Sequence, residues 1–251
     1  MSLAGRLLNV FAAPSEVFDD VKSAAPSIGN WLVPLLLAAV VGTMSVIIMF
    51  SQPAMLRQIH EQQVKAMEDN VSSGKMSRAQ ADQAEAMLEK FNGPTFMMIT
   101  GSIGAVISSV LRIFWWTFIL WLLALIFLKT KLDFMKLLEA AGLATMITVL
   151  ATIVTMLLTV ILGKVSTPSL ALLVKDFDPK NGVHLALAAV NPFSFWQVWL
   201  MAVALARISG ARVARTLTLT TVYWIVVQLF LIGLVLITSA VFSGVKSLSN
   251  H

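Results

Sequence analysis

The chain has 251 residues, of which 58% are hydrophobic and 12% are charged, and its mean hydropathy is +0.84. These values exceed what a water-soluble domain carries, so the composition indicates an integral membrane protein. The net charge of +5 comes mostly from Lys and Arg beside apolar runs, which indicates membrane topology and argues against a nucleic-acid partner. Because the sequence contains no cysteine, it excludes disulfides, thiolate nucleophiles, iron–sulfur sites and cysteine-type zinc sites.

The first 30 residues mix apolar and charged positions and are interrupted by Pro14 and Pro26. This pattern predicts short amphipathic helices on the membrane surface, with Pro14 in the first turn of the second one. A first membrane span is expected over 31–50, with Asn30 as its cap and Trp31 at the level of the headgroups.

Residues 51–93 are polar and helix-forming, with Gly74 between two stretches. They predict a helical hairpin outside the lipid. Residues 94–128 are apolar except for Arg112, and as one helix they would span roughly 50 Å, whereas one crossing needs only about 30 Å. Two crossings would require a tight reversal at Arg112 and would move the following lysines to the disfavoured side. One long or kinked helix is therefore preferred.

The chain continues with a third span over 137–163, a loop over 164–190, a fourth span over 193–208 and a fifth over 216–242. The predicted fold is thus an all-α polytopic bundle with five transmembrane helices. Lys and Arg concentrate near the N-terminus and in the short connections on the same side. The positive-inside rule therefore predicts a cytoplasmic N-terminus and an extracytoplasmic hairpin, loop and C-terminus.

A polar stripe follows the third span, because five threonines recur there at spacings of three and four. They are Thr145, Thr148, Thr152, Thr155 and Thr159. One interpretation is a hydrated pathway for a solute. The favoured one is a close packing face whose hydroxyls bond to carbonyls one turn back. A second small-residue face, formed by Gly101, Ala105 and Ser109, is expected to pack against these threonines.

Isolated polar residues in apolar surroundings are the other intramembrane candidates. Ionisable residues inside a membrane span are candidate functional residues, and Arg112 is one of them. Because it lies near the end of its span, its side chain could instead extend to the membrane surface or pair with Asp176 or Asp178. Gln228 in the fifth span is expected to make an interhelical hydrogen bond.

Arg207, Arg212 and Arg215 surround a short turn between the fourth and fifth spans. Three guanidinium groups there suit anionic lipid headgroups or an acidic surface of a partner protein, and ordinary topological anchoring is the simplest reading.

The sequence offers few candidate catalytic residues. His60 and Glu61 are followed by Val64 where a zinc-protease helix would carry its second histidine. No catalytic, cofactor-binding or metal-binding residues are assigned.

The order of these features resembles the bacterial branch of the Yip family, the Ypt/Rab-interacting membrane proteins. The resemblance rests on the five spans and on two segments, Phe11-Ala12-Ala13-Pro14-Ser15-Glu16-Val17-Phe18 and Asn191-Pro192-Phe193-Ser194-Phe195-Trp196. It covers nearly the whole chain, and the large hairpin is an elaboration on compact members.

The resemblance implies a non-enzymatic membrane protein. Eukaryotic relatives act in vesicle traffic with small GTPases, a role that does not transfer to a bacterial chain. The leading hypothesis is a scaffold or adaptor for another membrane protein, with self-association as a further expectation about partners. A small-solute transporter or channel that uses the threonine stripe is the alternative.

Overall fold

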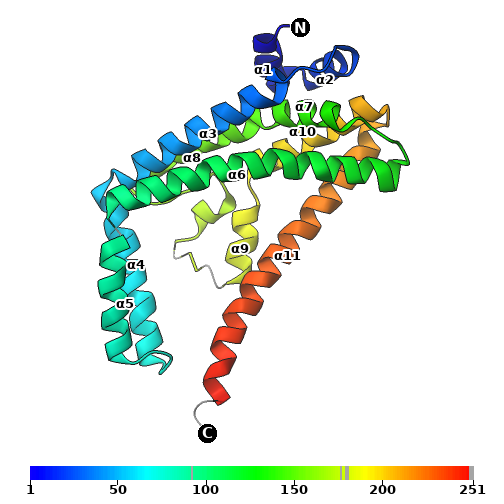
Figure 1. Cartoon of the computed structure of the whole chain (residues 1–251). Coiled ribbons are helices and arrows are strands. Elements are labelled where there is room, and N and C mark those ends of the chain that lie inside the picture. The colour runs from blue at the N-terminus through cyan, green and yellow to red at the C-terminus, as the bar shows by residue number, and fades with distance from the viewer. Residues whose placement is uncertain (92, 176, 179–180, 249–251) are drawn as a thin grey trace.

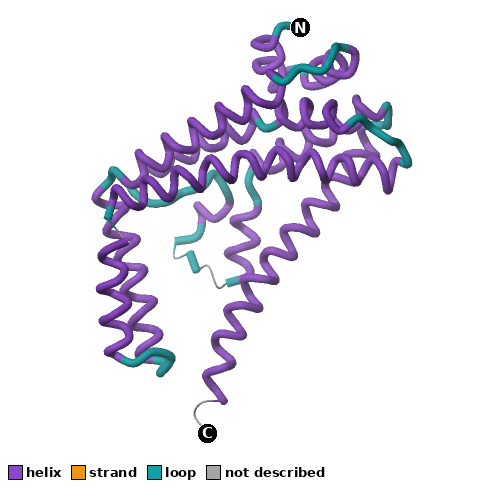
Figure 2. The backbone as a smooth tube through the Cα atoms, viewed as in Figure 1, coloured by secondary structure: helices purple, strands orange, loops and turns teal. Residues whose placement is uncertain are grey.

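The computed structural model describes residues 1–91, 93–175, 177–178 and 181–248, and its regular structure is helical, with no strand among these residues (Figures 1 and 2). In chain order the elements are α1 (Leu3–Ala12), α2 (Pro14–Ser23), α3 (Gly29–Phe50), α4 (Pro53–Ser72), α5 (Arg78–Phe91), α6 (Pro94–Leu123), the π-helical turn η1 (Ala124–Leu128), α7 (Phe134–Ala144), α8 (Met146–Leu162), the 3₁₀ turn η2 (Leu170–Leu173), α9 (Gly182–Ala189), α10 (Pro192–Ser209) and α11 (Val213–Leu248).

Four stretches are long and apolar enough to cross a membrane: Gly29–Phe50, Pro94–Leu128, Phe134–Leu162 and Val213–Thr238. A fifth is added if α9 and α10, which are bent by 55° relative to each other, form one span. The prediction of an all-helical polytopic membrane bundle is therefore confirmed. The range 94–128 forms one continuous stretch that ends in the π-helical turn.

The structure differs from the predicted spans in two places. The third stretch is divided at Thr145, where the chain leaves α7 and starts α8. The predicted loop 164–190 contains η2 and α9. Asn181 caps α9 by accepting hydrogen bonds from the amides of Val183 and His184. The apolar stretch that enters α10 is thus already helical before Pro192.

The main core lies where α7 and α10 meet α1 and α2. Every residue of α7 from Leu137 to Ala144 is buried, as is nearly all of α10 from Gln197 to Ile208. Val10, Val17, Phe18 and Val21 of the N-terminal helices are completely buried in the same cluster. Each such side chain contributes roughly 1.5–3 kcal/mol on burial. The N-terminal helices are thus an integral part of the bundle, and their predicted position at the membrane surface stays a prediction.

Close helix packing joins α6 to α3 rather than to the threonine stripe. A Cβ at Gly101 would lie 2.7 Å from Val46 of α3, and one at Gly42 would lie 3.3 Å from Ala105. The expected pairing of the small-residue face with the threonines is wrong, because α3 is the partner that fits it. Gly142 of α7 approaches α3 even more closely, with a virtual Cβ 2.5 Å from the Cα of Trp31.

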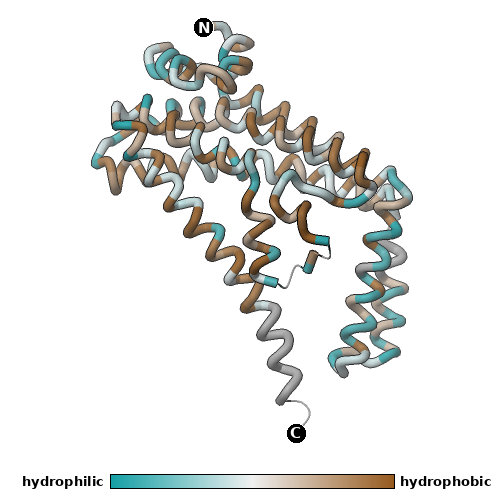
Figure 3. Tube along the Cα trace, turned by 180° about the vertical axis from the view of Figure 1, so that it is seen from behind, coloured by the Kyte–Doolittle hydropathy of each residue, from teal (hydrophilic) through white to brown (hydrophobic). Residues whose placement is uncertain are grey.

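The helices α4 and α5 form a hairpin that projects from the end of the α3–α6 layer, and α11 runs away from the bundle along its length (Figure 1). Hydrophilic residues gather on the hairpin, whereas apolar residues dominate the layer and the part of α11 over 213–238 (Figure 3). A capping box starts α5, because Ser77 and Gln80 exchange hydrogen bonds.

Candidate functional site

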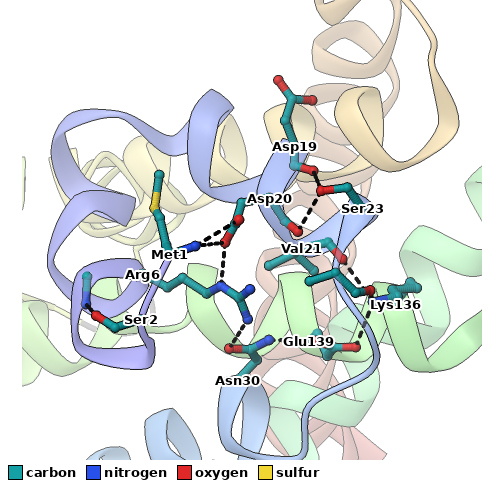
Figure 4. A network of polar contacts seen from close by, with 12 residues as sticks. Met1, Ser2, Arg6, Asp19, Asp20, Val21, Ser23, Asn30, Lys136 and Glu139 are labelled. Atoms are coloured by element: carbon teal, nitrogen blue, oxygen red, sulfur yellow. Dashed lines mark hydrogen bonds and ion pairs between the residues drawn. The ribbon is translucent and has the colours of Figure 1, made fainter.

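A buried chain of polar side chains connects α1, α3 and α7 (Figure 4). Arg6 Nη1 donates to Asn30 Oδ1 at 3.1 Å, and Asn30 Nδ2 donates to Glu139 Oε2 at 2.6 Å. Asn30 and Glu139 are completely buried, and Arg6 is 8% exposed. Because an amide both donates and accepts, Asn30 links a cation to an anion that do not meet directly.

The two ends of this chain are held by α2. Arg6 Nε donates to Asp20 Oδ2 at 2.7 Å, and the amine of Met1 also binds this carboxylate, at 2.9 and 3.0 Å. The hydrogen bond from this amine, and next the one from Arg6, hold the pKa of Asp20 below its usual value. At the other end, Lys136 Nζ lies 3.5 Å from Glu139 Oε1 and donates to the carbonyls of Val21 and Ala24 at 2.8 and 2.6 Å.

Local sequence places these groups. Asp133 caps α7 by accepting from the amide of Met135, which sets the register that puts Lys136 and Glu139 on one face as an i,i+3 pair. The absence of a Cβ at Gly142, one turn further on, lets α7 approach α3 closely enough for Glu139 to reach Asn30. A buried, paired cluster of this kind is costly to break, so it fixes how the N-terminal helices sit on the bundle.

The three arginines of the α10–α11 turn have different roles in the structure. Arg207 pairs with Asp19 at 3.3 Å, and its carbonyl accepts from Lys22 at 2.9 Å, so it holds α2. Arg215 Nη2 donates to the carbonyl of Phe127 at 2.7 Å. Arg212 is exposed, and its side chain makes no hydrogen bond or ion pair with any described residue.

Most hydroxyls of the threonine stripe bond within the bundle. Thr145 and Thr152 donate to carbonyls one turn back, those of Ala141 and Thr148. Thr159 accepts from the amide of Ser166 at 3.2 Å, and no hydrogen bond of Thr155 is recorded among the described residues. The Thr148 hydroxyl lies 3.3 Å from Gln197 Oε1 of α10. Two of the five hydroxyls are thus back-bonded, and Thr148 and Thr159 bond to other segments.

The two isolated polar candidates lie apart from this cluster. Arg112 is exposed on the surface of α6, and its side chain makes no hydrogen bond or ion pair within the described part of the chain. Of its suggested partners, Asp176 lies outside the described residues, and the ion pairs of the described residues do not include one between Arg112 and Asp178. Gln228 of α11 is half-buried and likewise makes no recorded hydrogen bond there.

Sequence reasoning missed Glu139 and Gln197. Glu139 lies inside a predicted apolar span, so the rule that singled out Arg112 applies to it equally. Lys136, three residues earlier, is the signal of a partner on the same helix face. Gln197 lies just after an Asn-Pro helix start and gives no comparable signal. Among the described residues, no group of three or more His, Asp or Glu side chains could hold a metal ion.

Several apolar spans, with amphipathic N-terminal helices fastened into their core by a charge cluster, define a polytopic helical membrane protein. The family model of the Yip1 domain matches residues 8–237, so the chain belongs to this family. The resemblance drawn from the segments at Phe11 and Asn191 is thereby confirmed. No curated protein and no solved structure matched the chain significantly.

Proposed function

We propose that the protein is a non-enzymatic membrane adaptor that binds another membrane protein through the α4–α5 hairpin. We place the hairpin outside the cytoplasm, with a cytoplasmic N-terminus in a bacterial inner membrane, because the opposite end of the bundle carries the excess of Lys and Arg. Membership of the Yip1 domain family supports the non-enzymatic part of the proposal.

The observation that carries the proposal is the position of the hairpin. It projects away from the bundle (Figure 1) and packs mainly on itself and on the end of α3. Met55 and Ala81 are buried, whereas most of the other described hairpin side chains are at least partly exposed, including Met87 at 65%. An ordered two-helix extension that adds little to the bundle core still costs conformational entropy, so a partner bound there would account for its presence.

The base of the hairpin also offers a recess. A hollow of about 310 Å³ lies between α4 and the start of α6. Its lining residues are Leu56, Arg57, Ile59, His60, Glu61 and Met97. The mixture of apolar, acidic and basic groups suits an amphipathic side chain of a protein better than a free ion.

Quantitative co-purification from native membranes tests the proposal. The full chain is compared with a hairpin variant, Asp82→Lys, Glu85→Lys and Met87→Lys, which changes three exposed positions of α5. Leu8→Lys, Asn9→Lys and Glu16→Lys, at exposed positions of α1 and α2, is the control that also adds positive charge. An unrelated five-span protein measures background.

A near-stoichiometric protein that is lost from the hairpin variant and kept by the control supports the adaptor role. Retention of every enriched protein by the hairpin variant, or no protein above background, contradicts it. The melting temperatures of both variants in detergent are measured first, because the comparison requires an intact bundle.

A further inference from the structure

One end of the bundle carries more positive charge than its own acids neutralise. Its internal ion pairs join Arg6 to Asp20, Lys136 to Glu139 and Arg207 to Asp19. Asp133 is occupied as the cap of α7, and Glu16 lies in the first turn of α2. The remaining cations of the two nearby connections form no ion pair within the described residues: Lys129, Lys131, Arg212 and Arg215.

These four residues are exposed and come from two connections that the structure brings together. Arg215, in the first turn of α11, donates to the carbonyl of Phe127 in η1 at 2.7 Å. This bond fixes the start of α11 against the end of the α6–η1 stretch. Lys129 directly follows η1 in a left-handed conformation, with φ 57°, and this turn ends the helix there. The α6–α7 and α10–α11 connections therefore present their cations on one surface, which we call the basic edge.

An apolar strip adjoins the basic edge. Leu125, Ile126 and Phe127 are 37%, 49% and 50% exposed, and they lie at the end of a membrane-spanning stretch. A surface with apolar side chains on the lipid side and unpaired cations immediately beyond them matches the two parts of a phospholipid. Because the strip lies in a membrane-spanning stretch, acyl chains cover it in the bilayer, and the cations just beyond it lie at the level of the headgroups.

We propose that the basic edge binds an anionic phospholipid, with the headgroup phosphate held by Arg212 and Lys131, supported by Lys129 and Arg215, and the acyl chains lying on Leu125 to Phe127. Guanidinium and ammonium groups are the common ligands of phosphate, and basic pockets beside membrane helices bind anionic headgroups. This proposal is independent of the hairpin and of the adaptor role.

Native mass spectrometry of the purified full chain tests it. The protein in neutral detergent is titrated with phosphatidylglycerol or with phosphatidylcholine of identical acyl chains. The site variant is Lys131→Gln with Arg212→Gln, which leaves the bond of Arg215 and the turn at Lys129 intact. The matched control is Lys75→Gln with Arg78→Gln, which removes the same charge from the hairpin.

We expect one phosphatidylglycerol to bind with about tenfold preference over phosphatidylcholine, and we expect the site variant alone to lose most of that preference. Equal binding of the two lipids would overturn the proposal, and so would an equal loss in both variants, which would indicate a general effect of net charge. Displacement of the lipid by millimolar inorganic phosphate would also overturn it, because the site would then recognise a soluble anion. Unchanged melting in phosphatidylcholine micelles shows that the variants are folded.

Discussion

Asn30 and Glu139 lie 109 positions apart, yet the amide of Asn30 donates a 2.6 Å hydrogen bond to the carboxylate of Glu139 at a place where both side chains are completely buried. The same amide accepts from Arg6, so one neutral residue holds a cation and an anion in place. Removing the Asn30 side chain takes one buried hydrogen bond from Arg6, which keeps Asp20, and one from Glu139, which keeps Lys136.

Asn30→Ala is expected to lower the free energy of unfolding by about 3 kcal/mol, because Arg6 and Glu139 both lose a buried hydrogen bond. Unfolding in mixed micelles, followed by circular dichroism, measures the effect. Asn9→Ala, at an exposed position of α1, is the control and should change stability by less than about 0.5 kcal/mol. A loss of similar size in the two variants would mean that the cluster does not hold the N-terminal helices.

Gly142→Ala is expected to destabilise the bundle by about 2–3 kcal/mol, since the added methyl group would lie 2.5 Å from the Cα of Trp31 and 2.8 Å from the carbonyl oxygen of Asn30. Backbone atoms cannot move aside as a flexible side chain can. Gly104→Ala has no atom within 4 Å of the new Cβ and should be neutral or slightly stabilising. In detergent, Gly142→Ala should therefore melt at a lower temperature than Gly104→Ala. The reverse order would refute the close approach of α7 to α3.

The ion pair of Asp20 predicts acid sensitivity. Its pKa is lowered in the folded protein by the amine of Met1 and by Arg6, so the pair stabilises the fold above the unfolded pKa of about 3.9. That contribution is lost as the pH falls below this value and through the folded pKa. Melting temperatures measured from pH 7 to pH 3 should therefore fall less steeply for Asp20→Asn than for the unchanged protein.

The control for this measurement is Asp82→Asn, at an exposed hairpin position that makes no ion pair with a described residue. Its acid profile should follow that of the unchanged protein. Identical slopes for Asp20→Asn and the unchanged protein would show that the pair does not contribute to stability.

Gln197→Leu is expected to be neutral or to stabilise the bundle by up to about 1 kcal/mol. The Nε2 of Gln197 is buried without a hydrogen-bond acceptor among the described residues, and Oε1 meets only the Thr148 hydroxyl, at 3.3 Å. Replacing an incompletely satisfied amide by an apolar group of similar size removes the cost of its burial. Thr148→Val, the matched variant, should cost under about 1 kcal/mol, because hydrogen bonds between membrane helices are weak. A clear loss of stability in Gln197→Leu would instead indicate that the amide has a partner.

Much of the fold follows from the sequence, because uncharged runs of sufficient length have only the helix available in lipid. The family also follows from it, through the segments at Phe11 and Asn191. The tertiary pairing does not. The face at Gly101 fits α3 or the threonine stripe equally well by residue size, and only the three-dimensional arrangement selects α3. The break at Thr145 is similarly hidden, because no Pro or Gly marks it.

The candidate site is less predictable for a related reason. Arg207, Arg212 and Arg215 look equivalent in the sequence, but Asp19 and the carbonyl of Phe127 occupy two of them and leave Arg212 unpaired. The sequence shows where basic residues gather. Whether each one is free to bind a ligand depends on the acidic side chains and carbonyls that distant helices place beside it. Glu139 was open to prediction from its place in an apolar span. Its partner Asn30 was predicted only as the cap of the first span, which is wrong, because α3 begins at Gly29 and the Asn30 side chain bonds to Arg6 and Glu139.

The contact between α2 and α10 also sets the order in which the protein can assemble. Lys22 reaches the carbonyl of Arg207, 185 residues later in the chain, and Phe18 is completely buried in the cluster that includes α10. Because synthesis proceeds from the N-terminus, α1 and α2 leave the ribosome long before their packing surface exists. Their final packing therefore cannot form before α10 is made, although they are synthesised first.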